Sequence, residues 1–167
     1  MNWRAGVVAL CATVFLSVTG TSVAMVTTTS DGREGLETYR AIAEKVAKHG
    51  WACVYVAGSK QEGNFAYSVG LSGKGQPEVL LVSGDDYNAA CTMINLVAKA
   101  ILARSSPIRD GDAPVAKMSR DVRVRSIYAD ELYAKCLAAA RWRDEHGVKD
   151  ATGMQIVLAD KNGRFPD

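Results

Sequence analysis

Residues 65–86, FAYSVGLSGKGQPEVLLVSGDD, restrict the fold of this chain more than any other stretch, because two apolar runs flank a glycine-rich centre. Both runs are rich in the β-branched and aromatic residues typical of strands, and the short connection between them favours antiparallel pairing. The centre lacks the GxxxxGK[ST] spacing of a nucleotide-binding loop, and a strand rather than a helix follows it. The stretch therefore predicts a hairpin.

The rest of the chain predicts helices and strands that do not alternate strictly. Helices are expected at about 34–49, 87–101 and 130–146. Further strands are expected at 51–57, 122–128 and 154–160. A length of 167 residues suits one domain. We therefore expect a single α+β domain over residues 36–167, with a mostly antiparallel sheet of about five strands covered by two to three helices.

Residues 1–24 have the pattern of a secretory signal peptide, since a positive charge at Arg4 precedes an apolar run and small residues follow it. The apolar run is shorter than the roughly 20 residues that a membrane-spanning helix needs, so no stable membrane anchor is expected. Met25 follows directly, and a start at Met25 is the alternative, which makes residues 1–24 a mis-assigned extension. Residues 25–35 are interpreted as a flexible lead-in.

The cysteines bear on the choice between export and a cytoplasmic location. Without the first 24 residues, Cys53, Cys91 and Cys136 remain, an odd number with no close pairing along the chain. Such a set is ordinary in a reducing compartment and awkward in an oxidising one. This favours a cytoplasmic protein that starts near Met25, with export as the alternative. All three cysteines lie in apolar patterns, so we expect core packing rather than thiolate chemistry.

Charge and metal-ligand spacing exclude several classes of function. The 20 basic and 18 acidic residues leave a formal net charge of +2, which gives no overall field for nucleic acid. The basic cluster from Arg109 to Arg125 is interleaved with aspartates and predicts a solvated surface. His49 and His146 each precede a glycine at a predicted helix end, where a donor satisfies free carbonyl groups. Because no metal-ligand spacing is present, no metal or cofactor is expected.

Polar residues within or beside the apolar strands are the candidates for a site, because buried polar groups must be paired. A pocket built from Tyr67, Glu78, Gln155 and Arg164 would suit a small anionic or amide-bearing ligand. The simpler interpretation is an Asp160–Arg164 pair that closes the terminal turn. The candidate ligand-binding residues are Tyr67, Gln76, Gln155, Asp160 and Arg164, and the candidate catalytic residue is Glu78.

Four segments of the chain form a recognisable set: HGW before a strand, FAYSVGL, PEVLLVSG followed by a helix, and MQIVLADKNGRFPD at the end. They resemble segments of a bacterial family, domain of unknown function 4262, and the resemblance covers about residues 36–167. It implies a small, mostly cytoplasmic bacterial α+β domain and supplies no activity. Gln76 stands where the family usually has histidine, Ala159 where it has proline, and Asp167 where tryptophan would continue. If the family uses that histidine as a catalytic base, glutamine at position 76 would impair catalysis in this chain. If the family's site only binds a ligand, Gln76 can still donate and accept hydrogen bonds.

Three functional hypotheses follow. The first is a small-molecule-binding or regulatory module. The second is a hydrolase or transferase in which Glu78 acts as general base. The third is a protein-interaction module that uses the loop at 105–121, a stretch rich in proline, glycine, serine and aspartate. The sequence does not specify an oligomeric state.

Overall fold

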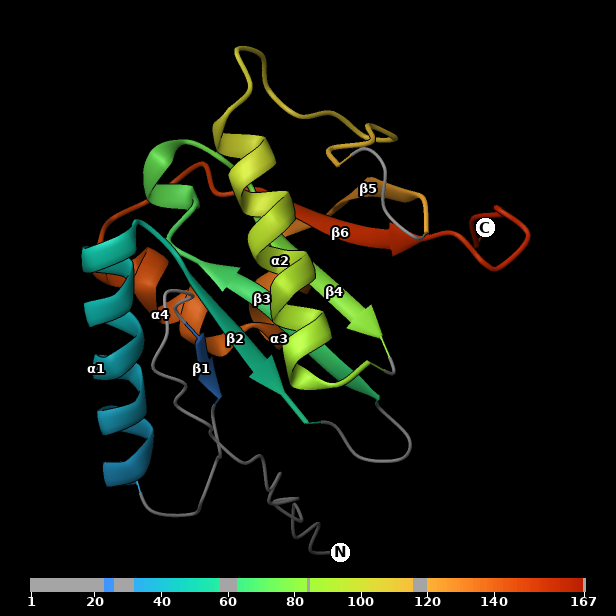
Figure 1. Cartoon of the computed structure of the whole chain (residues 1–167). Helices are drawn as coiled ribbons and strands as arrows, with labels where there is room; N and C mark the ends of the chain where they lie inside the picture. Colours follow the sequence, from blue (N-terminus) through green and yellow to red (C-terminus); the bar gives the residue numbers. More distant parts are fainter. Residues whose placement is uncertain (1–22, 26–31, 58–62, 84, 116–119, 167) are drawn as a thin grey trace, which may run out of the picture.

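The computed structural model describes residues 23–25, 32–57, 63–83, 85–115 and 120–166 (Figure 1). Most of the signal-like segment and of the lead-in lies outside these ranges. The strands are β1 (Val23–Met25), β2 (Ala52–Val56), β3 (Asn64–Val69), β4 (Glu78–Ser83), β5 (Val122–Ile127) and β6 (Gly153–Leu158). The helices are α1 (Gly32–His49), α2 (Tyr87–Leu102), α3 (Ala129–Lys135) and α4 (Leu137–Glu145), and a 3₁₀ turn, η1, covers Ser72–Lys74.

The strands form one open sheet in the order β1-β2-β3-β4-β6-β5. Pairing is antiparallel between β2 and β3, β3 and β4, and β5 and β6, and parallel between β1 and β2 and between β4 and β6. The predicted α+β class and the mostly antiparallel sheet are confirmed, and so is the hairpin at 65–86. The five predicted strands are β2 to β6, and the three-residue β1 adds to them.

Alternating side chains of the strands build a separate core on each face of the sheet. On one face, Cys53 and Tyr55 of β2 pack in a cluster with the apolar stripe of α2. On the other face, Val54 and its neighbours pack against α1, α3 and α4. Figure 1 shows α2 in front of the sheet with α3 and α4 behind it. The helix expected at 87–101 is α2, and Asp86 caps it by accepting a hydrogen bond from the Ala89 N–H.

The predicted helix at 130–146 is divided into α3 and α4 at Cys136. This residue has φ −99° and ψ 70°, outside the helical region, and its side chain is fully buried. The break reorients the chain so that Leu132 in α3 and Trp142 in α4 both reach the same core. Helical periodicity continues across the break, which is why the sequence predicted one helix.

Cys53 and Cys91 form a disulfide that joins β2 to α2. This corrects the expectation that the cysteines are unpaired, because residues 38 positions apart face each other across the core. The odd cysteine count therefore does not argue for a reducing compartment. Cys136 is free and buried, as the core interpretation predicted.

The chain after α2 runs beside the edge strand β5. The Gly111 N–H donates to the Val124 carbonyl (2.8 Å), and the Val124 N–H donates to the Asp112 carbonyl (2.9 Å). An Arg104–Asp112 ion pair of 2.8 Å and the buried side chain of Ile108 fix this segment. Within the parts of the 105–121 loop that the structure describes, these contacts cover part of a sheet edge that would otherwise invite pairing.

The two histidines lie at helix ends, as predicted. His49 is the last residue of α1, and His146 follows the last residue of α4. His146 Nδ1 lies 2.8 Å from the Trp142 carbonyl and its ring stacks on the Trp142 ring. None of the described helices is both long and apolar enough to cross a membrane.

Candidate functional site

Glu78 lies at the start of β4 and is 1% exposed. Its Oε1 accepts hydrogen bonds from the Gly70 N–H (2.8 Å), the Ser72 N–H (3.0 Å) and the Ser72 hydroxyl (2.9 Å). Its Oε2 accepts one from the Ser68 hydroxyl (2.5 Å). The glycine-rich turn therefore does cradle an anion, and this anion is a side chain of the protein itself.

This arrangement gives Glu78 a structural role. Ser68 also accepts a hydrogen bond from the Val79 N–H, so the carboxylate, the turn and two strands are tied together. Tyr133 and Cys136 lie close by, and burial is the main cause that raises the pKa of Tyr133 to about 12 and raises the pKa of Cys136 as well, with the charge of Glu78 adding to both shifts. A general base needs an accessible lone pair. Because the described turn and strands occupy both oxygens, the geometry does not support that hypothesis.

Tyr67 and Gln76 line neither of the two hollows that contain Gln155, Asp160 and Arg164. Tyr67 is buried beneath α4, where its hydroxyl accepts a hydrogen bond from the Ala138 N–H (3.4 Å) and its ring stacks on Phe65. Burial raises the pKa of Tyr67 well above its usual range. Gln76 lies directly before Pro77 and the start of β4, and its N–H donates to the Leu71 carbonyl (3.2 Å). The expected pocket of Tyr67, Glu78, Gln155 and Arg164 does not form.

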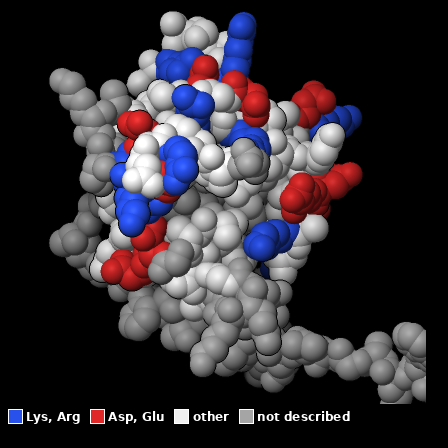
Figure 2. Space-filling view, turned by 90° about the vertical axis from the view of Figure 1, so that its right-hand side faces the viewer, with Lys and Arg blue, Asp and Glu red and all other residues white. Residues whose placement is uncertain are grey.

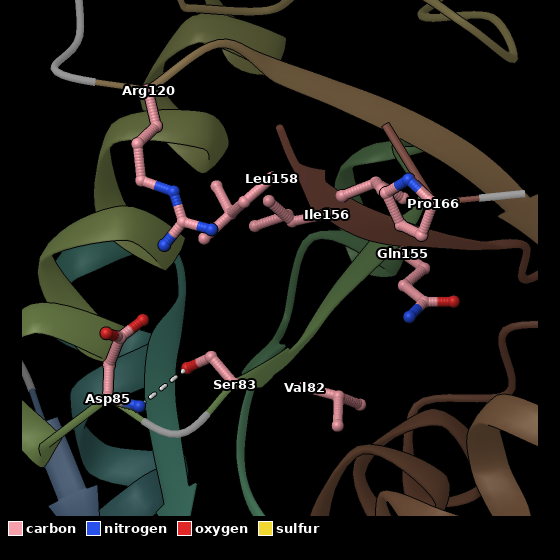
Figure 3. Close-up of a pocket in the computed structure, with 9 residues that line it drawn as sticks. Val82, Ser83, Asp85, Arg120, Gln155, Ile156, Leu158 and Pro166 are labelled. Atoms are coloured by element: carbon pink, nitrogen blue, oxygen red, sulfur yellow. Dashed lines mark hydrogen bonds between the residues drawn. The ribbon is translucent and has the colours of Figure 1, made fainter. Parts of the chain in front are cut away.

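A different hollow lies where β4 and β6 diverge. These parallel strands pair from Glu78 and Gly153 to Leu81 and Ile156, and the described pairing ends there. Beyond that point a hollow of about 250 Å³ is lined by residues of both strand ends (Figure 3). We call this hollow the β4–β6 notch; its lining residues are Val82, Ser83, Asp85, Arg120, Gln155, Ile156, Val157, Leu158 and Pro166. Backbone groups that the two strand ends turn toward each other have no strand partner in this register.

Two side chains of opposite charge face the notch. Arg120 is anchored through Nε, which donates to the Ala159 carbonyl (3.0 Å). Asp85 lies between β4 and α2, and its N–H donates to the Ser83 hydroxyl (3.3 Å). Figure 3 shows the guanidinium of Arg120 and the carboxylate of Asp85 pointing toward each other. Among the ion pairs of the described residues, none includes either group.

Sequence reasoning missed both of these residues. Arg120 belongs to the basic cluster that predicts a solvated surface, and either Asp85 or Asp86 suits the helix cap by sequence, a role that Asp86 fills. A polar residue directly after a strand was the available signal for Asp85. No local signal distinguished Arg120 from Arg123 or Arg125, because its partner, Ala159, lies 39 residues away.

The predicted residues Asp160 and Arg164 lie beside the notch, in a shallower hollow of about 570 Å³ that shares Arg120, Leu158 and Pro166 with it. Asp160 accepts hydrogen bonds from the Asn162 and Arg164 N–H groups and from Arg164 Nε (3.2 Å). These contacts, led by the Arg164 N–H, lower the pKa of Asp160. The simpler interpretation, a pair that closes the terminal turn, is therefore what the structure contains.

The residues after this turn fold back over β5. The guanidinium of Arg123 lies 4.3 Å from the centre of the Phe165 ring, and Arg125 donates to the Pro166 carbonyl (3.0 Å). Pro166 thereby forms one wall of the notch, next to Gln155 (Figure 3). Of the predicted ligand-binding residues, Gln155 lines the notch and Asp160 and Arg164 lie next to it. No group of three or more potential metal-ligating side chains occurs in the part of the chain that the structure describes.

The model of the family described as Domain of unknown function (DUF4262) matches residues 45–167. The chain belongs to this family. The resemblance seen in the sequence is thereby confirmed, and the motif segments that carried it fall in two places. Segments 65–71 and 77–78 meet at the buried carboxylate of Glu78, and Gly50 of segment 49–51 lies against Gly70. Segment 155–166 contains the end of β6 and residues that line the notch. No curated protein and no solved structure matches the chain.

Proposed function

We propose that this protein is a small-molecule-binding module whose ligand occupies the β4–β6 notch through an anionic group held by Arg120. Arg120 carries the proposal because its guanidinium is anchored at one nitrogen by a backbone carbonyl and has no carboxylate partner among the described residues. An anchored guanidinium loses less conformational freedom on binding and can hold a planar anion with two parallel hydrogen bonds.

The position of the notch also supports binding. It lies at the carboxyl ends of two parallel strands, next to the helix that follows one of them, which is where ligands of open α/β sheets bind. Unpaired backbone groups of the strand ends, the Ser83 hydroxyl and the Gln155 amide supply further hydrogen bonds. Val82, Leu158 and Pro166 supply apolar contact. A volume of about 250 Å³ is below the roughly 300 Å³ of the smallest drug-sized pockets, so the ligand is small.

Substitution of Arg120 tests the proposal. Acetate, succinate and inorganic phosphate are titrated into the protein by calorimetry, and the unfolding temperature is measured with each. Arg120→Gln is expected to lower the affinity for the most tightly bound of these anions by about 10-fold or more, because a charge-assisted hydrogen bond contributes roughly 1.5–3 kcal/mol. The matched control is Arg109→Gln, which removes an exposed guanidinium outside the notch. Equal affinity of the wild type and Arg120→Gln for every anion would reject the proposal.

The contacts give less support to the other two hypotheses, catalysis by Glu78 and protein interaction through the 105–121 loop. The oxygens of Glu78 are occupied by internal donors, and the described part of the 105–121 loop is engaged with β5. Glu78 is buried and bonded internally, whereas the described part of the loop exposes side chains such as Arg109, and none of its contacts indicates a particular partner.

A further inference from the structure

The second charged wall of the notch restricts the class of ligand. Asp85 is half-buried, and contacts on both sides of its peptide fix its backbone. Its N–H donates to the Ser83 hydroxyl, and its carbonyl accepts hydrogen bonds from Tyr55 Oη (3.3 Å) and Asn64 Nδ2 (3.4 Å). Since Asp86 provides the helix cap, the carboxylate of Asp85 has no structural task in the described contacts. It is held at the wall and directed toward Arg120 (Figure 3).

Arg120 and Asp85 do not neutralise each other. A direct ion pair would bring nitrogen and oxygen within 4.0 Å, and no such pair joins them. The notch therefore presents a positive group and a negative group across one small volume. Lys, Arg, Asp and Glu side chains are mixed on the side of the molecule shown in Figure 2, with no large area of one sign, so the local pair decides which charges are attracted.

We infer that the ligand is a small zwitterion of the size of an α-amino acid, with its anionic group on Arg120 and its protonated amine on Asp85. This inference rests on the proposed function. A ligand with an anion alone would place a negative charge near Asp85, and one with an amine alone would place a positive charge near Arg120. A zwitterion pairs both charges. Val82, Leu158 and Pro166, at separate places around the notch, supply apolar contact for an aliphatic side chain.

The first test compares three probes that differ in one group each. Leucine is the zwitterion, 4-methylpentanoate lacks its amine, and 3-methylbutylamine lacks its carboxylate. Calorimetry on the wild-type chain is expected to show leucine, or another aliphatic α-amino acid of a panel, binding at least about 10-fold more tightly than its two truncated analogues. This comparison needs no variant and is independent of any effect of substitution on folding.

The second test assigns each charge to its residue. Asp85→Asn is expected to lower the affinity for the amino acid by about 10-fold or more and to leave the affinity for 4-methylpentanoate unchanged or higher. Arg120→Gln is expected to lower the affinity for both the amino acid and 4-methylpentanoate. The control Asp150→Asn, at an exposed aspartate outside the notch, is expected to change neither. The unfolding temperature of each variant without ligand verifies that it is folded.

The outcomes separate the two proposals. If 4-methylpentanoate binds as tightly as the amino acid, or if Asp85→Asn leaves amino-acid binding unchanged, the zwitterion inference is wrong, and Arg120-dependent binding of anions still stands. If no probe binds and no anion responds to Arg120→Gln, the proposed function fails, and the inference fails with it.

Discussion

At the scale of single residues, Glu78 determines the conformation of the glycine-rich turn. Its Oε1 accepts the N–H groups of Gly70 and Ser72, which would otherwise be buried without partners. Gly70 has φ +105°, and a Cβ there would lie 2.5 Å from a methyl carbon of Val46, so glycine is required for both conformation and space. The turn is a compact anion site that is already filled.

Replacing Glu78 by glutamine tests this role. The amide nitrogen cannot accept a hydrogen bond, so at least one buried donor is left unsatisfied. Glu78→Gln is expected to lower the free energy of unfolding by about 2–4 kcal/mol in denaturant titration. Glu44→Gln, at an exposed position of α1, is the control and is expected to stay within about 0.5 kcal/mol of the wild type. A Glu78→Gln protein as stable as the wild type would contradict the structural role.

Asp160 gives a pH dependence to the terminal turn. Hydrogen bonds to the ionised form hold the pKa of Asp160 below its ordinary value of 3.8. The stabilisation is therefore fully present above about pH 4 and is lost as the pH falls through the lower folded-state pKa. The amide resonances of Asn162 and Arg164 are expected to shift with a midpoint below 3.8 in an NMR titration. In Asp160→Asn this transition is expected to disappear; a midpoint at or above 3.8 would show that the contacts do not form.

At the scale of elements, the disulfide connects the sheet to the helix that covers it. Cys53 lies in β2 and Cys91 in α2, at a sequence separation of 38. Closing a loop of this length restricts the unfolded chain and is expected to contribute about 3–4 kcal/mol to stability in the chain-entropy account. The same link holds the first half of α2, the helix that begins beside the notch.

Comparison of the wild type with Cys53→Ala/Cys91→Ala measures this contribution. The double variant is expected to unfold at a lower denaturant concentration and to be insensitive to reductant. The wild type is expected to fall to a similar stability when dithiothreitol is added. Cys136→Ala is the control, since it removes a free cysteine and leaves the disulfide in place. A wild type whose stability is unchanged after mass spectrometry shows complete reduction would contradict the expected contribution.

At the scale of the whole molecule, the strand order creates the notch at a distance from the buried carboxylate. The chain leaves β4, forms α2, β5, α3 and α4, and returns as β6 beside β4. Because the two strands run parallel, their carboxyl ends lie at the same edge of the sheet. Beyond the last pair, Leu81 and Ile156, the two strand ends turn away from each other (Figure 1). Glu78 and Gly153 mark the opposite end of the same pair. The structural carboxylate and the proposed binding site therefore occupy opposite ends of one strand pair.

Hydrogen exchange tests whether the two ends respond separately. With a ligand bound in the notch at 100 times its Kd, local openings that destroy the notch become less favourable by about 2.7 kcal/mol. Amides at 82–83 and 155–158 are expected to exchange more slowly, whereas those of the turn at 70–76 keep their rates. Slower exchange at 70–76 without change at 155–158 would show that the ligand binds at the turn and would contradict binding in the notch.

The sequence by itself determined most of the elements of this protein, because helical and strand periodicity are local properties of the chain. It predicted the hairpin, the helix at 87–101, the fold class, and the closed turn of Asp160 and Arg164. The tertiary structure decided the rest, since each missed feature joins residues far apart in sequence. These features are the Cys53–Cys91 disulfide, the break at Cys136 that packing imposes on α3 and α4, and the facing charges of Asp85 and Arg120. A pattern along the chain shows which face of an element is apolar, but the parallel return of β6 beside β4 decides which polar groups meet in space.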